Sequence, residues 1–256
     1  MELYFSKRVA VILVLIVGIG VFLLGSLTSN LTQEVVQLTE DRLVPIYKVD
    51  TEEQKLAITL DGMWGAEHTP HLLEIFAEHE VTITFFFGGN WLEDYPEMAK
   101  KIAAEGHEIG NHTYSHPHLN SLSRDEIAEE LEYNQELIED LVGEQPKLFR
   151  PPFGEYSNKV IEVAEDLGFQ TIQWSIDSLD WKEPGVDFIV ERLLEKSEAG
   201  DIILMHNNAP HTPEALERVI PKLQERGYEL VKLSELTYDE DYYIESHSGL
   251  QKKLGN

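Results

Sequence analysis

The sequence of 256 residues predicts an α/β fold in which about seven strands form one parallel sheet. Apolar, strand-like segments alternate with helix-like segments, an order typical of parallel sheets that are covered by helices. The length that remains after an N-terminal apolar run suits one domain. This alternation leaves open whether the sheet stays open or closes into a barrel.

Residues 1–30 are predicted to form a membrane anchor or signal segment. Lys7 and Arg8 precede an apolar run from Val9 to Leu27, which is long enough to span a hydrocarbon core of about 30 Å. The basic pair on the N-terminal side predicts that the rest of the chain lies outside the cytoplasm. A cleaved signal peptide is the alternative, but no A-x-A site follows the run. We therefore expect an uncleaved, single-pass anchor in the cell membrane.

The remaining chain divides into a linker (31–46), one α/β domain (47–238) and a polar tail (239–256) that we expect to fray. Ser123 and Glu126 fit a capping box that opens a long acidic helix, and Gly143 fits its C-terminal stop. Thr69 with Pro70 is a further helix-start signal. Strands are expected at Leu56–Leu60, Val81–Phe87, Glu108–Gly110, Leu148–Arg150, Gln170–Trp174, Asp201–Met205 and Tyr228–Val231.

The composition excludes several classes of function. The formal net charge of −27 repels phosphate backbones, so we expect no nucleic-acid partner. There are no cysteines, which excludes disulfides and thiolate metal sites.

Polar side chains follow several predicted strands directly, and this is where parallel α/β folds gather their reactive groups. Asp61 follows the first strand on a glycine-containing turn and is placed to act as a general base on water. Arg150 opens the segment R-P-P-F-G after another strand, where its guanidinium can orient a carboxylate through a bidentate pair. His206 ends the segment I-L-M-H, and a histidine poised near neutrality is a good general acid.

His112 and His116 lie in the segment N-H-T-Y-S-H-P-H. Their spacing of four predicts two imidazoles on one side of a helical turn, which suits one zinc ion. The segment W-S-I-D-S-L-D-W contains Asp180 and Trp181 after a strand. Aromatic rings near carboxylates suit a carbohydrate, because sugar rings have apolar faces that stack on them. Together these signals predict a metal-assisted hydrolase.

In this order, the segments T-L-D, H-T-Y-S-H, R-P-P-F-G, D-S-L-D-W and L-M-H resemble the five motifs of the NodB-homology polysaccharide deacetylases, carbohydrate esterase family 4. The resemblance extends from about Tyr47 to about Leu236. Within the family, I-Y-K-V-D, M-W-G and D-W-K-E-P-G-V are most similar to membrane-anchored, sporulation-type deacetylases.

The resemblance implies a distorted (β/α) barrel that removes N-acetyl groups from an amino-sugar polymer such as the peptidoglycan of the cell wall. It implies a divalent metal, zinc in most members, with His112 and His116 as ligands. Asp61 would be the base, held by Arg150, and His206 would be the acid, tuned by Asp180. Substrate contacts would come from the following residues: Phe153, whose backbone N–H would also stabilise an oxyanion, Trp181 and Leu204.

One position departs from the family pattern. The first motif of the family has two adjacent aspartates, and the second is the third metal ligand; here Gly62 follows Asp61. Two histidines alone hold zinc poorly, so Asp61, water, Glu67 or His68 would have to complete the site. Two other functions therefore stay open: a glycan-binding domain without turnover, and an esterase that removes O-acetyl groups.

Overall fold

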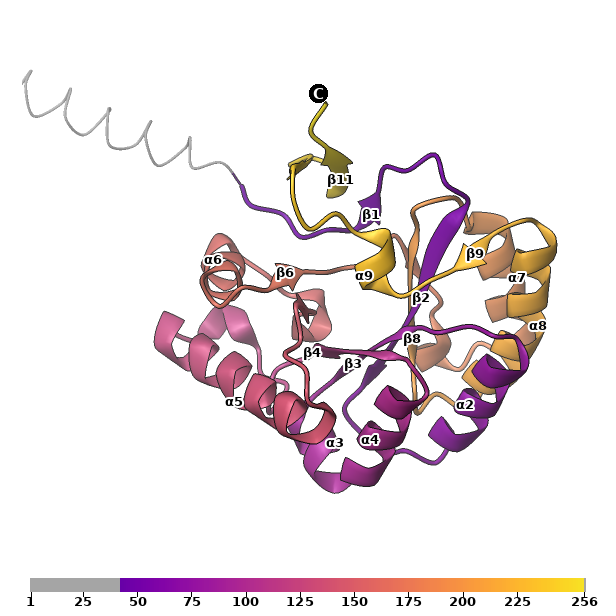
Figure 1. The fold of residues 1–256 in the computed structure, drawn as a ribbon, viewed down its shortest axis with the longest axis horizontal. Helices are drawn as coiled ribbons and strands as arrows, with labels where there is room; N and C mark the ends of the chain where they lie inside the picture. Colours follow the sequence, from indigo (N-terminus) through magenta and orange to yellow (C-terminus); the bar gives the residue numbers. More distant parts are fainter. Residues whose placement is uncertain (1–41, 256) are drawn as a thin grey trace, which may run out of the picture. The chain divides into compact units, whose positions relative to one another are not determined.

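A curled sheet of parallel strands forms the centre of the computed structural model, which describes residues 42–255 (Figure 1). Seven strands are hydrogen-bonded in the order β6-β5-β4-β3-β2-β8-β7, and β9 pairs with β2. Within residues 42–255 no ladder joins β6 to β7, so the curled sheet is open between these edges. The predicted α/β fold with about seven parallel strands is confirmed. The strands of this sheet are β2 (Lys55–Gly62), β3 (Thr84–Phe87), β4 (Glu108–Asn111), β5 (Leu148–Phe149), β6 (Gln170–Thr171), β7 (Ile176–Asp177), β8 (Ile202–His206) and β9 (Glu229–Leu230).

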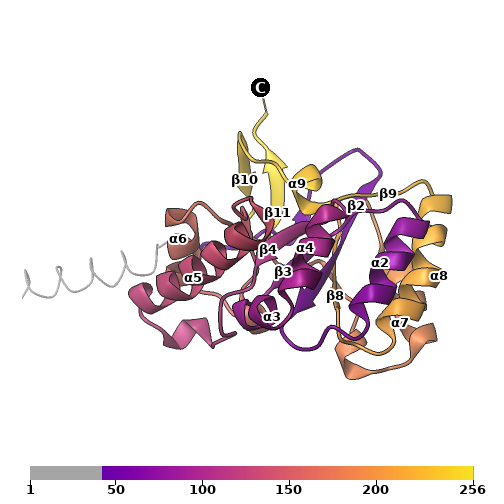
Figure 2. The ribbon, with the colours of Figure 1, turned by 60° about the horizontal axis from the view of Figure 1, so that its bottom comes forward.

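Helices pack around the outside of this sheet (Figures 1 and 2). α2, α7 and α8 lie together on one side, and α5 and α6 lie beyond the other edge. The apolar faces of the helices cover a core in which strand β2 is buried along almost its whole length, as expected for a central parallel strand. The helices are α2 (Thr69–Glu78), α3 (Gly89–Asp94), α4 (Pro96–Ala104), α5 (Arg124–Val142), α6 (Asn158–Asp166), α7 (Val186–Lys196), α8 (Thr212–Glu225) and α9 (Leu233–Leu236), with short 3₁₀ turns η1 (Leu119–Ser121), η2 (Pro152–Gly154) and η3 (Asp180–Lys182).

The long helix α5 begins and ends where the sequence predicts. The Ser123 hydroxyl accepts a hydrogen bond from the Glu126 N–H, and the Glu126 carboxylate accepts one from the Ser123 N–H, which completes the capping box. Gly143 ends the helix in the left-handed conformation, with φ 83°. Helix α2 differs by one position, because His68 is the N-cap residue and Thr69 is already helical.

Only the first two residues of the expected strand Gln170–Trp174 form a strand (β6), and an unpredicted short strand, β7, follows at the opposite edge of the sheet. β6 ends at Thr171, where Ile172 bridges to Ile46. The chain then crosses over, and β7 (Ile176–Asp177) pairs with β8. Periodicity gave no sign of this break, because the pairing that ends β6 depends on a residue more than a hundred positions earlier in the sequence.

The expectation of a frayed C-terminal tail is wrong. Strands β10 (Tyr242–Ile244) and β11 (Leu250–Lys253) form a hairpin, and β11 also pairs with β1 (Lys48–Val49). Side-chain bonds to the backbone fasten this hairpin: buried Gln251 donates to the Tyr238 carbonyl at 2.8 Å and accepts from the Tyr238 N–H at 3.0 Å. Polar bonds of this kind leave no hydrophobic pattern in the sequence.

The predicted anchor in residues 1–30 lies outside the described residues. Among residues 42–255, none of the helices combines the length and the apolar character needed to cross a bilayer.

Candidate active site

The candidate residues meet where the strands end at their carboxyl edge. Asp61 lies near the end of β2 and His206 ends β8, while His112 follows β4 and Arg150 follows β5. They surround a cavity of about 620 Å³ in which every predicted site residue except the fully buried Arg150 and Asp180 contributes to the wall. The cavity is lined by Asp61, Gly62, Met63, Trp64, His112, His116, Pro151, Phe153, Gly154, Trp174, Asp177, Trp181, Glu183, Leu204, His206, Asn208, Ala209 and Pro210.

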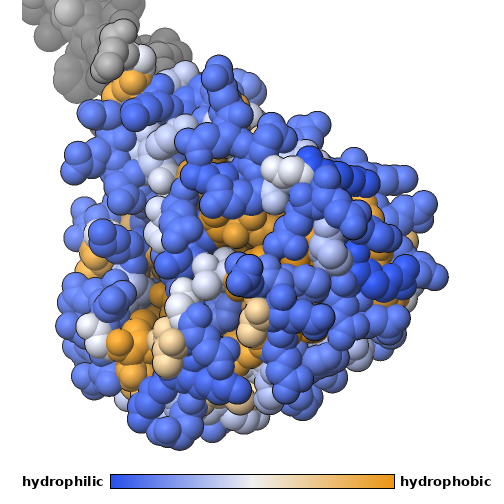
Figure 3. Space-filling model, turned by 45° about the vertical axis from the view of Figure 1, so that its right-hand side comes forward, coloured by the Kyte–Doolittle hydropathy of each residue, from blue (hydrophilic) through white to orange (hydrophobic). Residues whose placement is uncertain are grey.

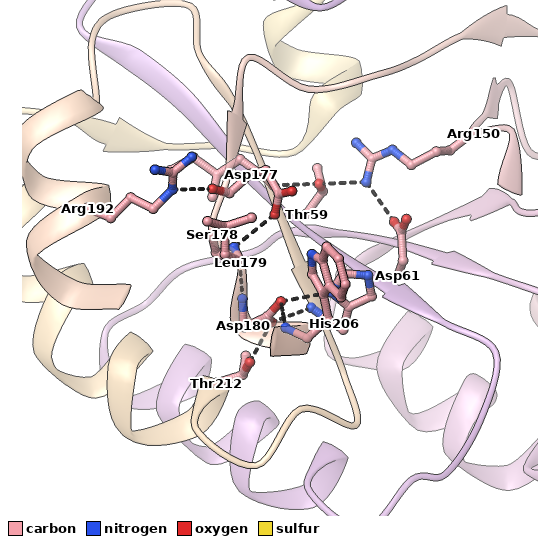
Figure 4. A network of polar contacts seen from close by, with 12 residues as sticks. Thr59, Asp61, Arg150, Asp177, Ser178, Leu179, Asp180, Arg192, His206 and Thr212 are labelled. Atoms are coloured by element: carbon pink, nitrogen blue, oxygen red, sulfur yellow. Dashed lines mark hydrogen bonds and ion pairs between the residues drawn. The ribbon is translucent and has the colours of Figure 1, made fainter. Parts of the chain in front are cut away.

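Arg150 fixes the carboxylate of Asp61 (Figure 4). Its Nη1 donates to Asp61 Oδ1 at 2.6 Å and to Thr59 Oγ1 at 2.8 Å. The expected bidentate pair is not formed, because Nη2 donates to the carbonyl of Gln173 at 3.1 Å instead. This single contact leaves Asp61 Oδ2 without a bond to the guanidinium, and Oδ2 lies 3.8 Å from His112 Nε2.

His112 and His116 come together through a loop and not through a helical turn. Their ring centroids lie 5.0 Å apart, but Thr113 and His116 have positive φ angles of 65° and 61°. His112 Nδ1 lies 2.7 Å from the Arg150 carbonyl, so this nitrogen donates and Nε2 is left as an acceptor. Burial lowers the pKa of both histidines, that of His116 to about 4, and keeps the rings neutral at pH 7.

Two buried asparagines that the sequence analysis missed hold this loop in place. Asn111 Oδ1 accepts hydrogen bonds from the Thr113 N–H at 2.8 Å and from Asn134 Nδ2 at 3.0 Å. Asn134 also donates to the Phe87 carbonyl at 3.0 Å. Asn134 lies on α5, and only the tertiary structure brings it to the loop, although N-H-T-Y-S-H contains Asn111 at a strand end.

Asp180 and His206 form a second polar pair. Asp180 Oδ1 lies 2.8 Å from His206 Nδ1, and Oδ2 accepts from the His206 N–H at 2.7 Å and from Thr212 Oγ1 at 2.6 Å (Figure 4). Burial by itself lowers the pKa of His206, but the hydrogen bond and charge of Asp180 outweigh it and raise that pKa. Burial likewise opposes ionisation of Asp180, yet its bonds to His206 and Thr212 lower its pKa. Thr212 was not predicted from the sequence.

The predicted substrate contacts all lie on the cavity wall. Phe153 and Trp181 are 55% and 54% exposed, and Leu204 is buried on β8. Phe153 has a left-handed backbone with φ 59° and lines the cavity. The backbone N–H of Phe153 as an oxyanion donor stays a prediction.

The metal centre implied by the family resemblance lacks one ligand. Within residues 42–255 no three histidine, aspartate or glutamate side chains are arranged to hold a metal ion together. A Cβ at Gly62 would lie 2.4 Å from the Phe87 ring, so no side chain fits there without movement. Glu67 and His68 do not line the cavity, and neither replaces the missing ligand. The residues present therefore do not fit a three-ligand centre, and the identity of the metal stays a prediction.

On the face shown in Figure 3 hydrophilic side chains predominate, and apolar side chains form separate patches between them.

Comparison with known proteins agrees with the motifs. The family model for polysaccharide deacetylase matches residues 48–172. The peptidoglycan-N-acetylmuramic acid deacetylase PdaA of Bacillus subtilis is 32% identical over 204 residues, which are 78% of this chain and 78% of that protein. A peptidoglycan-N-acetylglucosamine deacetylase of Bacillus cereus is 35% identical, over 74% of this chain and 91% of its own length.

Among solved structures, similarity extends to a protein that is described as a pseudoenzyme, unlike the deacetylases above. A structure described as a pseudoenzyme of carbohydrate esterase family 4 from Bacillus anthracis has a TM-score of 0.73 and 37% identity, covering 75% of this chain and 68% of that one. The chain spans only 60% and 66% of two further Bacillus relatives, with which it shares 39% and 37% identity. Since the Bacillus cereus deacetylase aligns over nearly all of its length, the chain belongs to the polysaccharide deacetylase family.

Proposed function

We propose that this protein removes N-acetyl groups from an amino-sugar polymer, with Asp61 as the base and His206 as the acid. One observation carries the proposal: Asp61 on β2 and His206 on β8 are register partners. Partners on adjacent strands lie about 4.8 Å apart and direct their side chains to the same face of the sheet. A base and an acid therefore face the same cavity side by side, each oriented by a buried partner of opposite charge.

The reaction uses these two groups in turn. Asp61 Oδ2 takes a proton from a water molecule, whose oxygen then attacks the acetamide carbonyl carbon. As the carbon–nitrogen bond breaks, His206 Nε2 gives its proton to the leaving amine, because its Nδ1 is engaged by Asp180. The products are acetate and a free amino sugar. We assign no step to a metal, because the described residues supply two histidine nitrogens and no third ligand.

The substrate we propose is cell-wall peptidoglycan, at its N-acetylglucosamine or N-acetylmuramic acid units. Support comes from the two Bacillus relatives, which are named for deacetylation of these units, and from the exposed rings of Phe153 and Trp181 in the cavity wall. We further propose that residues 1–30 anchor the domain on the outer side of the cell membrane. Lys7 and Arg8 before the apolar run support that orientation.

A second candidate is a domain that binds cell-wall glycan without turnover. Gly62 favours it, since this position cannot supply a metal ligand and its space is filled by Phe87. The structural similarity to a pseudoenzyme points in the same direction.

Acetate release separates these functions. The full-length protein in detergent would be incubated with N-acetylglucosamine oligomers or with peptidoglycan, with added zinc and with a chelator. We expect release that falls by about a hundredfold or more in Asp61→Asn and His206→Asn. His79→Asn is the matched control, because this half-buried histidine at the end of α2 lies outside the cavity.

Each other result has a distinct meaning. Glycan binding without acetate release, under any metal condition, would refute the deacetylase and favour the binding domain. Release from O-acetyl esters but not from acetamides would identify an esterase.

A further inference from the structure

Trp64 is the most exposed large hydrophobic side chain of residues 42–255, at 62%. It lies in the loop between β2 and α2, three positions after Asp61, and it lines the cavity. A single exposed apolar residue is ordinary in soluble proteins. The surroundings of Trp64 are what set it apart.

The loop that carries Trp64 is fixed at its base. The carbonyl of the next residue, Gly65, accepts hydrogen bonds from Trp91 Nε1 at 2.7 Å and from Asn207 Nδ2 at 2.9 Å. Both donors are fully buried. Gly65 itself has φ 67°, a conformation that favours glycine. The indole is therefore held outward by a rigid loop, and ligand binding would cost little further ordering.

The ring of Trp64 continues a row of aromatic rings along the cavity mouth. Trp64 lies edge-on to His116 with centroids 5.2 Å apart, and His116 lies edge-on to Phe153 with centroids 4.5 Å apart. Trp64 and Phe153 are both more than half exposed. The row thus connects the β2–α2 loop, which carries Trp64, with the turn η2, which carries Phe153.

We propose that Trp64 is a glycan-binding residue that stacks on a sugar ring next to the unit whose N-acetyl group is hydrolysed. A pyranose ring presents a flat face of C–H groups, which matches a rigid, exposed indole with its apolar face and polar N–H edge. The proposal rests on the proposed function for the class of ligand. It adds which residue contacts the neighbouring sugar of that polymer, on the side of the β2–α2 loop.

Calorimetric titration of the full-length protein in detergent with N-acetylglucosamine pentamer tests this role. We expect Trp64→Ala to bind about tenfold more weakly, as for an aromatic anchor at a binding surface. Trp64→Phe should retain most of the affinity. Phe188→Ala is the control, since Phe188 is 43% exposed on α7 and does not line the cavity. The monomeric sugar should show no dependence on Trp64.

Wild-type affinity for the pentamer in Trp64→Ala would overturn the inference. An equal loss in Trp64→Ala and Phe188→Ala would also overturn it. Absence of pentamer binding by a wild-type protein that still releases acetate from peptidoglycan would overturn the sugar contact alone, whereas absence of both binding and release would refute the contact and the proposed function together. Trp64-dependent binding without acetate release would support the contact and refute only turnover.

Discussion

Any side chain introduced at Gly62 is expected to clash with the ring of Phe87, so that the effects of substitutions at these two positions on stability should be coupled. A Cβ at Gly62 would lie 2.4 and 2.5 Å from two carbons of the Phe87 ring, about 1 Å closer than the 3.4 Å at which ordinary contact begins. The ring has little room to retreat, because Phe87 is fully buried and stacks on Trp91 at 3.7 Å with an interplanar angle of 3°. Replacing Gly62 by aspartate, which restores the family's carboxylate, should therefore overpack the core.

The size of the effect follows from the crowding. Overpacking of a well-packed core costs about 1–3 kcal/mol, which in a domain of this size lowers the unfolding midpoint by about 2–12 °C. Gly62→Ala should show most of this loss, since it adds the same Cβ without the charge. In Gly62→Asp combined with Phe87→Val the carboxylate gains space, so we expect the double variant to be about 0.5–3 kcal/mol more stable than additivity predicts.

Thermal unfolding of the wild-type protein, Gly62→Ala, Gly62→Asp, Phe87→Val and the double variant measures this coupling, and zinc titration accompanies it. We expect zinc affinity to rise in the double variant, where a third ligand is available, and to stay near the wild-type value in Gly62→Asp. Gly62→Ala that unfolds at the wild-type temperature, or a cycle that is additive, would refute the steric argument.

Three further predictions concern the two ion pairs. In Asp180→Asn the pKa of His206 should fall, because burial then acts without the opposing carboxylate; NMR titration of the ring checks this, and an unchanged pKa would contradict it. The stability that this pair contributes should be complete between about pH 3.8 and 6.5. Above this range the stabilisation due to the raised pKa of His206 is lost as the imidazolium deprotonates, and below it the stabilisation due to the lowered pKa of Asp180 is lost as the carboxylate is protonated. Urea unfolding of the wild-type protein and Asp180→Asn at three pH values should show the largest difference inside this window, and a constant difference would refute the linkage. Arg150→Met should lower the free energy of unfolding by about 3–5 kcal/mol, since it leaves Asp61 buried without its counter-charge; the exposed Arg218→Met is the control, and equal losses would show that burial of the pair does not matter.

The sequence was sufficient to predict which side chains form the site and that they lie at the ends of strands. Asp61, Arg150 and His206 each follow an apolar run directly, and parallel strands bring such positions to one edge. The structure places all three at the cavity or directly beneath it. The local pattern was enough here, because apolar runs indicate the buried strands and their alternation with helices indicates that these strands are parallel.

The sequence was not sufficient to predict how those side chains are oriented relative to one another. The spacing of His112 and His116 suggested a helical turn, yet the loop adopts positive φ angles that Asn134, far along the chain on α5, supports through Asn111. The single contact between Arg150 and Asp61 likewise depends on the carbonyl of Gln173, at the break between β6 and β7. Both features are set by long-range contacts, which periodicity and spacing do not encode.

Arg150 explains how the rest of the site keeps its geometry although Gly62 provides no ligand. Its guanidinium holds Asp61, while its backbone carbonyl accepts the hydrogen bond from His112 Nδ1. One buried residue therefore orients both the proposed base and a histidine of the predicted metal site. The orientation of Asp61 and His112 depends on this protein contact and not on position 62, while Asp180 orients His206 independently. We therefore expect that the absence of the second aspartate weakens metal binding but leaves the proposed acid and base in position, and acetate release with added zinc measures how much catalysis that pair sustains.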